Sequence, residues 1–163
     1  IMLQIVESDL LKTAKYKYSD LGYFLLKDII EERYNLPLNN LVDIAIYKPL
    51  GLATMGYLPK EKFEKDRIVP TEKDDYFRDQ LLVGDVHDMG AAMLGGVGGH
   101  AGLFSTSHDI ANFSQMMLNK GILNGSRVFS GYYIGQFTKK QFLPKKSDFG
   151  FFFDQKKAEK NAR

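Results

Sequence analysis

The serines of this sequence lack the neighbours that would make one of them a nucleophile. No serine is followed by lysine three positions later, and no Gly-x-Ser-x-Gly elbow is present. A serine hydroxyl is a weak nucleophile and needs an adjacent base before it can attack a substrate. Cysteine is absent, which removes the thiolate alternative. The sequence therefore predicts that these residues do not hold a complete nucleophilic centre.

The histidines are the other candidates for proton transfer or metal binding, and they are His87, His100 and His108. Companion ligands at helical spacing are missing around His87, so we predict no metal site. His100 stands between Gly99 and Ala101, and such small neighbours allow a substrate to come close. We therefore predict that His100 and Ala101 contact substrate, with a purely structural histidine as the alternative.

A cluster of glycines offers a cofactor-binding alternative. Gly96, Gly98 and Ala101 satisfy the loose dinucleotide pattern Gly-x-Gly-x-x-Ala, and Tyr23 and Lys27 have the Tyr-x-x-x-Lys spacing of short-chain dehydrogenases. The dinucleotide pattern needs a preceding strand, whereas the residues before these glycines have helical periodicity. The two features also stand in the reverse order along the chain. We therefore predict no cofactor, and a nucleotide-dependent oxidoreductase is the weakest of three hypotheses.

Helical periodicity recurs along the chain, so the expected fold is mostly α. Helices are expected at about 20–34, 39–50, 86–94, 106–120 and, more weakly, 130–142. Two of them should bury apolar stripes, made of Leu41, Val42, Ala45 and Ile46 and of Ile110, Phe113, Met116 and Met117.

Two further segments complete the expected organisation. Residues 59–80 show no periodicity and should form a long loop, either a lid or the wall of a site. Residues 149–153 are the one good strand candidate. The chain begins at Ile1 rather than Met, so we expect it to be part of a longer protein.

Composition bounds the partners. With 163 residues, 44% hydrophobic and 26% charged, the chain is long enough for one globular domain with a core. No apolar run reaches the roughly 18 residues of a membrane span. The segment from Lys139 to Arg163 is rich in lysine, but aromatic residues and Pro144 interrupt its clusters, so we interpret it as solvated surface and predict no nucleic-acid partner.

Four stretches stand in an order that resembles the class C β-lactamases, DD-peptidases and related esterases. They are residues 18–26 (YSDLGYFLL), 47–52 (YKPLGL), 99–106 (GHAGLFST) and 109–113 (DIANF). The first resembles the Tyr-x-Asn motif of that family, with Tyr18 at the tyrosine position and Asp20 at the asparagine position. Residues 68–72 (IVPTE) and 86–88 (VHD) resemble the branch often fused to glycoside hydrolases of the β-N-acetylglucosaminidase type.

The resemblance implies an architecture. Residues 1–163 would be a partial β-lactamase-like domain, with a helical lobe at about 18–142 and a return to the sheet at about 149–153. The whole would be an α/β (α+β) fold of the β-lactamase/transpeptidase type. Its Ser-x-x-Lys and Lys/His-Thr-Gly motifs would come from the rest of the same catalytic domain, which is the expected partner.

The resemblance also implies roles for two residues. Tyr18 would be the base or proton relay, but an unassisted tyrosine has a pKa of about 10 and is protonated at neutral pH. The chain alone is therefore expected to be inert. An ionised Asp20 only accepts hydrogen bonds and repels carboxylates, so a substrate-facing Asp20 favours a neutral ester, amide or sugar-linked substrate. Plain capping of the following helix is the alternative for Asp20.

Two functions follow from the resemblance. The first is a serine hydrolase that acts through an acyl-enzyme on a small or cell-wall-derived ester or amide. The second is a non-catalytic binding module attached to a glycoside hydrolase. Either would place the protein in the cell envelope, in the periplasm or outside the cell, on the resemblance alone.

Overall fold

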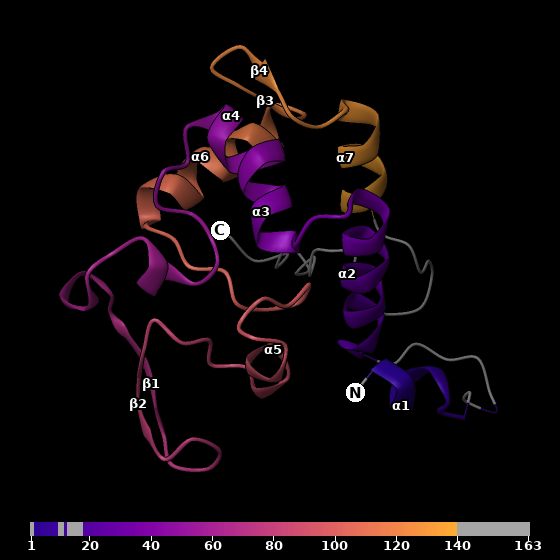
Figure 1. The fold of residues 1–163 in the computed structure, drawn as a ribbon. Coiled ribbons are helices and arrows are strands. Elements are labelled where there is room, and N and C mark those ends of the chain that lie inside the picture. The colour runs from indigo at the N-terminus through magenta and orange to yellow at the C-terminus, as the bar shows by residue number, and fades with distance from the viewer. Residues whose placement is uncertain (1, 10–11, 13–17, 140–163) are drawn as a thin grey trace, which may run out of the picture.

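The computed structural model describes residues 2–9, 12 and 18–139. The α-helices are α1 (Met2–Val6), α2 (Leu21–Tyr34), α3 (Leu38–Val42), α4 (Lys48–Leu50), α5 (Met89–Met93), α6 (Ser107–Leu118) and α7 (Gly131–Thr138). A π-helical turn, η1 (Asp43–Tyr47), joins α3 to α4, and η2 (Pro59–Glu61) and η3 (Lys65–Arg67) are short 3₁₀ helices. The strands are β1 (Pro70–Asp74), β2 (Gln80–Val83), β3 (Ile122–Leu123) and β4 (Ser126–Arg127). Figure 1 shows the hairpin of β1 and β2 projecting away from the helices.

The second predicted helix forms, but with a break in its register. It begins at Leu38 after Pro37, and its turns widen into the π-helical η1 before α4. Pro49 has no N–H to donate to the Ala45 carbonyl, so the regular α-helical ladder cannot pass this point. The prediction that Ala45 is buried is therefore wrong, and Tyr47 and Leu50 fill the core instead.

The main core lies where η1, α4, α6, β3 and α7 meet. Met116 is completely buried there, and Phe113 and Met117 pack against the cluster, as the predicted stripe of this helix requires. Ile110 was expected in the same stripe but is 53% exposed, so that part of the prediction is wrong. The buried residues of the cluster are Tyr47, Leu50, Leu52, Met55, Met116, Leu123 and Ile134.

The segment 59–80 is not the irregular loop that its sequence predicts. Its second half forms the antiparallel hairpin of β1 and β2, with Glu72 opposite Leu82. β1 is almost entirely polar because most of it faces solvent, and the alternation that reveals a strand is therefore missing. Leu82 is fully buried and anchors β2. The sequence therefore missed the four strands of the described residues, β1 to β4. The strand expected at 149–153 lies outside the described residues and stays a prediction.

An aspartate and an arginine hold the tip of this hairpin to the rest of the molecule. Asp74 accepts hydrogen bonds from the backbone N–H of Phe77 and from Nε of Arg78, at 2.8 and 2.7 Å. The Arg78 guanidinium also donates to the carbonyls of Val86 and His87, at 2.7 and 2.9 Å. The hydrogen bond from the Phe77 amide, reinforced by Arg78, keeps the pKa of Asp74 far below its ordinary value. The hairpin therefore braces the segment that leads into α5.

A second polar network fixes the start of α6. The Oδ2 atom of buried Asp109 accepts hydrogen bonds from the backbone N–H and the hydroxyl of Thr54, both at 2.7 Å. The Thr106 hydroxyl lies 2.7 Å from that of Thr54 and caps α6 by accepting from the Asp109 amide. Backbone bonds between Gly56 and Phe104 continue the contact. The C-terminal end of the stretch 99–106 is therefore held by residues 54 and 56.

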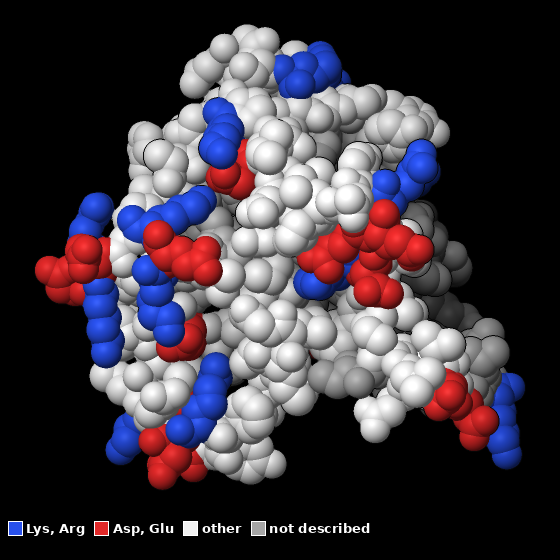
Figure 2. Space-filling model, in the orientation of Figure 1, with Lys and Arg blue, Asp and Glu red and all other residues white. Residues whose placement is uncertain are grey.

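Acidic and basic side chains are interspersed on the face shown in Figure 2. Among the described residues, none of the helices combines the length and apolar character needed to cross a bilayer.

Candidate functional site

Tyr18 and Asp20 lie immediately before the first turn of α2. The Tyr18 side chain is 70% exposed, and Asp20 is half-buried at the N-cap position. The Asp20 carbonyl accepts from the amides of Tyr23 and Phe24, but its carboxylate makes no capping hydrogen bond. Ser19 accepts from the Leu21 amide instead, at 3.3 Å. The Asp20 carboxylate thus does not cap α2.

The glycine-rich loop lies directly against this first turn. A Cβ at Gly99 would stand 2.6 Å from the Tyr23 carbonyl oxygen, so only glycine allows this approach. The next residue, His100, stacks its ring against Phe24, with 4.7 Å between ring centroids. The loop therefore places His100 against the first turn of α2, which follows Tyr18 in the sequence.

A carboxylate holds His100 in place from the other side. Oδ1 of Asp88 lies 2.8 Å from Nε2 of His100 and also accepts the Ala91 amide at 2.7 Å, which caps α5. Burial by itself would raise the pKa of Asp88, but the hydrogen bonds from Ala91 and His100 outweigh it and lower that pKa. Because an ionised carboxylate only accepts, Nε2 is the donor of this pair.

The His100 imidazole is buried within this contact. Its side chain is only 6% exposed, and its other nitrogen, Nδ1, is buried without a hydrogen-bond partner among the described residues. Gly98 and Gly90 leave room for the ring, since a Cβ at Gly98 would lie 3.0 Å from Nδ1. In this structure His100 joins α2, α5 and the loop.

Ala101 is half-buried, and its carbonyl accepts the Gly98 amide at 3.1 Å. The Gly98 carbonyl in turn accepts the hydroxyl of Tyr57 at 2.9 Å, and burial raises the pKa of that tyrosine. The loop is thereby closed on itself and tied to Tyr57. Contacts of Ala101 and His100 with substrate stay a prediction.

Sequence reasoning missed the two residues that position His100. Phe24 looked like one more apolar residue of an amphipathic helix. Asp88 was noted only within the 86–88 stretch (VHD) that resembles the branch fused to glycoside hydrolases. Around it, the described residues contain no group of three or more His, Cys, Asp and Glu side chains able to hold a metal ion. The available signal was Asp88 as the N-cap three residues before Ala91, a spacing that predicts a capping carboxylate. His87 pairs elsewhere, 2.6 Å from Glu72.

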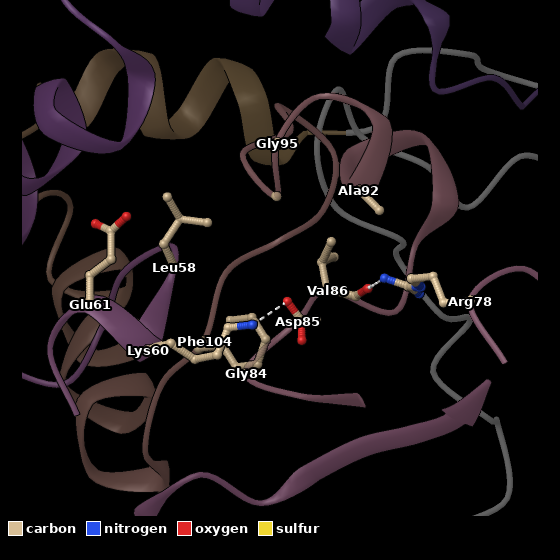
Figure 3. A pocket seen from close by; sticks show the side chains of 11 residues that line it. Leu58, Lys60, Glu61, Arg78, Gly84, Asp85, Val86, Ala92, Gly95 and Phe104 are labelled. Atoms are coloured by element: carbon tan, nitrogen blue, oxygen red, sulfur yellow. Dashed lines mark hydrogen bonds and ion pairs between the residues drawn. The ribbon is translucent and has the colours of Figure 1, made fainter. Parts of the chain in front are cut away.

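A hollow of about 270 Å³ adjoins the glycine-rich loop (Figure 3). Its apolar walls are Leu58 and Phe104, and Lys60 pairs with Asp85 at 2.6 Å on its rim. Arg78 also borders it, but its guanidinium is occupied by Asp74 and two carbonyls. Both cations of this hollow are therefore already paired, and Glu61 is the remaining charged residue of its lining.

Comparison with known proteins identifies the relatives of this chain. The family model described as Beta-lactamase matches residues 9–151. A protein of Salmonella agona (strain SL483), provisionally named D-alanyl-D-alanine carboxypeptidase, is 40% identical over 149 residues, which cover 84% of this chain and 34% of that protein. A protein of the same name from Salmonella typhi is 39% identical over the same length. The chain thus spans about a third of these relatives.

Two solved structures share the fold. The octameric penicillin-binding protein homologue from Pyrococcus abyssi superposes with a TM-score of 0.55 at 21% identity, covering 84% of this chain and 28% of that one. The D-amino acid amidase from Ochrobactrum anthropi SV3 gives 0.52 at 19% identity, covering 82% and 37%. The helix-rich arrangement with small antiparallel sheets is thus compatible with part of such an α+β fold. Since the family model covers most of its length, this chain belongs to the Beta-lactamase family of serine hydrolases.

Proposed function

We propose that this chain forms part of a serine hydrolase that cleaves an ester or amide through an acyl-enzyme. Tyr18 is its base or proton relay, Asp20 faces the substrate, and His100 and Ala101 shape the same end of the site. The observation that carries the proposal is the seating of the 98–101 loop on the first turn of α2, directly after Tyr18 and Asp20. Those are the two segments that resemble the family motifs.

The nucleophile and its lysine belong to other segments of the same catalytic domain. No serine of this sequence has lysine three positions on, and Tyr18 by itself is not ionised at neutral pH. In the complete site, neighbouring cations would lower the pKa of Tyr18 enough for it to accept a proton. The chain alone is therefore inert in this proposal.

The substrate is a small or cell-wall-derived ester or amide, and the site acts in the cell envelope. The name of the Salmonella relatives supports a peptide of D-amino acids. The Asp20 carboxylate, which does not cap α2, adds a preference for neutral substrates, because it repels a free carboxylate placed near it. Substrates whose terminal carboxylate is amidated or esterified should therefore react faster than the free acids. A fusion to a glycoside hydrolase, as residues 68–72 and 86–88 suggest, would fit the same cell-wall role.

Labelling with a fluorophosphonate, followed by intact-mass spectrometry, tests the proposal. A longer form of the protein that contains Ser-x-x-Lys should gain one phosphonyl group, and Tyr18→Phe should slow the gain about 100-fold or more. Ser19→Ala is the matched control, because the Ser19 hydroxyl only accepts a hydrogen bond from the Leu21 amide. This variant should react with the fluorophosphonate at the normal rate. Ligand binding without any adduct or turnover would instead support the binding-module alternative. An adduct on the 163-residue chain itself would contradict the placement of the nucleophile.

A further inference from the structure

A second hollow, of about 400 Å³, lies between the segment 54–69 and the segment 104–107. Phe63, Phe104 and Ile68 supply apolar lining, together with the 81%-exposed Val69. Hydroxyl groups come from Thr54, Ser105, Thr106 and Ser107. A concave surface that combines apolar side chains with a few polar groups is the usual form of a small-molecule site.

Arg67 supplies the one charge among the residues that line this hollow. Its guanidinium lies over the Phe63 ring, 5.4 Å from the ring centroid, and has no acidic partner within the described part of the chain. In the hollow beside the glycine-rich loop, by contrast, both cations are paired with carboxylates. An arginine held against an aromatic ring, with its donors unused, is prepared to bind an anion.

Hydrogen bonds hold two of the hydroxyl-bearing residues, Thr54 and Thr106, in place. Thr54 donates to the buried Asp109 through both its amide and its hydroxyl, and the Thr106 amide donates back to the Thr54 hydroxyl at 3.3 Å. Ser107 opens α6 beside them. A ligand would therefore meet a preformed surface and would lose little free energy in ordering it.

We infer that this hollow binds an organic monocarboxylate with a flat apolar body. The guanidinium matches a carboxylate through two parallel hydrogen bonds, and the phenylalanine rings supply the surface for the apolar body. One unpaired cation balances one negative charge, which favours a carboxylate over a doubly charged phosphate. The inference rests on Arg67 and its surroundings, and it is independent of the hydrolase proposed above.

Titration of the full chain with phenylacetate, followed by amide chemical shifts in NMR, tests this assignment. Saturable shifts are expected at residues 63, 67 and 104–107. Arg67→Gln should weaken binding about tenfold or more, which corresponds to about 1.4 kcal/mol. Lys65→Gln removes a neighbouring exposed cation that does not line the hollow, and it should change the affinity less than about twofold.

Two further measurements keep the result specific. Val69→Glu leaves Arg67 in place but offers it an internal carboxylate, so phenylacetate binding should fall as in Arg67→Gln. Benzyl alcohol, which has the ring without the charge, should bind more weakly than phenylacetate. Tighter binding of phenyl phosphate would overturn the carboxylate assignment. The site itself would be refuted by the absence of saturable shifts, or by equal losses in the Arg67 and Lys65 variants.

Discussion

Replacing Asp88 by alanine should loosen the contact that joins α2, α5 and the 98–101 loop. The change removes one carboxylate oxygen that accepts two hydrogen bonds, from the Ala91 amide at 2.7 Å and from His100 at 2.8 Å. It also leaves both nitrogens of a buried imidazole without a partner, since Nδ1 already has none. The whole loop that seats on α2 should then lose its main polar anchor.

The size of the effect follows from these two contacts. Loss of an N-cap costs about 1 kcal/mol, and a buried donor left without an acceptor costs about 1–3 kcal/mol. The Asp88 side chain is 37% exposed, so water can reach part of the space it leaves and the lower half of the range applies. We expect the free energy of unfolding to fall by about 2–3 kcal/mol.

Urea denaturation of the full chain measures this loss, and a double-mutant cycle assigns it. In a His100→Phe background, Asp88→Ala should cost only the cap, about 1 kcal/mol. Asp66→Ala removes an exposed carboxylate and should change stability by less than about 0.5 kcal/mol. An equal loss from Asp88→Ala in both backgrounds would refute the role we give to the His100 contact.

The same variant has a pH signature. The pKa of Asp88 in the folded chain lies below its ordinary 3.8, so its stabilising contribution is complete above that value and is lost as the pH falls through the folded pKa. The stability difference between wild type and Asp88→Ala should therefore be constant near neutrality and shrink below a pH of about 4. A difference that grows on acidification would contradict this sign.

Three further changes test other parts of the structure. Gly99→Ala places a Cβ 2.6 Å from a carbonyl oxygen of α2 and should destabilise by about 1–3 kcal/mol, whereas Gly22→Ala, which has open space, should be neutral or stabilising in urea denaturation. Asp74→Asn should reduce the acid sensitivity of the β1–β2 hairpin. Hydrogen bonds lower the pKa of Asp74, so its stabilising contribution is complete above a pH of about 4 and is lost progressively below it. Equal losses of amide protection on acidification in both proteins, measured by hydrogen exchange in the hairpin, would contradict this. Asp109→Ala leaves the amide and the hydroxyl of Thr54 without an acceptor, so the free energy of unfolding in urea should fall by about 3 kcal/mol. A loss under about 1 kcal/mol would show that water replaces the carboxylate.

Periodicity and capping residues in the sequence predicted the positions of α2 and α6. α2 spans Leu21–Tyr34 as expected and ends at Asn35, whose positive φ of 49° suits asparagine. α6 follows its Thr106 cap, and its stripe holds except at Ile110. These elements were readable because their capping residues and their apolar spacing act locally, over one or two turns.

The hairpin and the π-helical turn were not readable in the same way. β1 is mostly exposed and carries almost no apolar residues, so only its pairing with β2 makes it a strand. In η1, the widened turn before Pro49 rotates Tyr47 inward and Ala45 outward, which no fixed helical period anticipates. Both features depend on contacts that a local pattern of apolar and polar residues does not describe.

The candidate site, too, has features that the sequence predicts and features that appear only in the folded chain. Tyr18, Asp20 and the GHAGLFST stretch resemble family motifs, and this resemblance is readable in the sequence because each motif is a short string of residues. Their neighbours are visible only in the folded chain, where Phe24 of α2 and Asp88, the N-cap of α5, contact His100, and Gly99 meets the backbone of α2. The physical reason is that a motif fixes residue identity over a few positions, whereas burial and hydrogen bonding are fixed by segments that meet only when the chain folds.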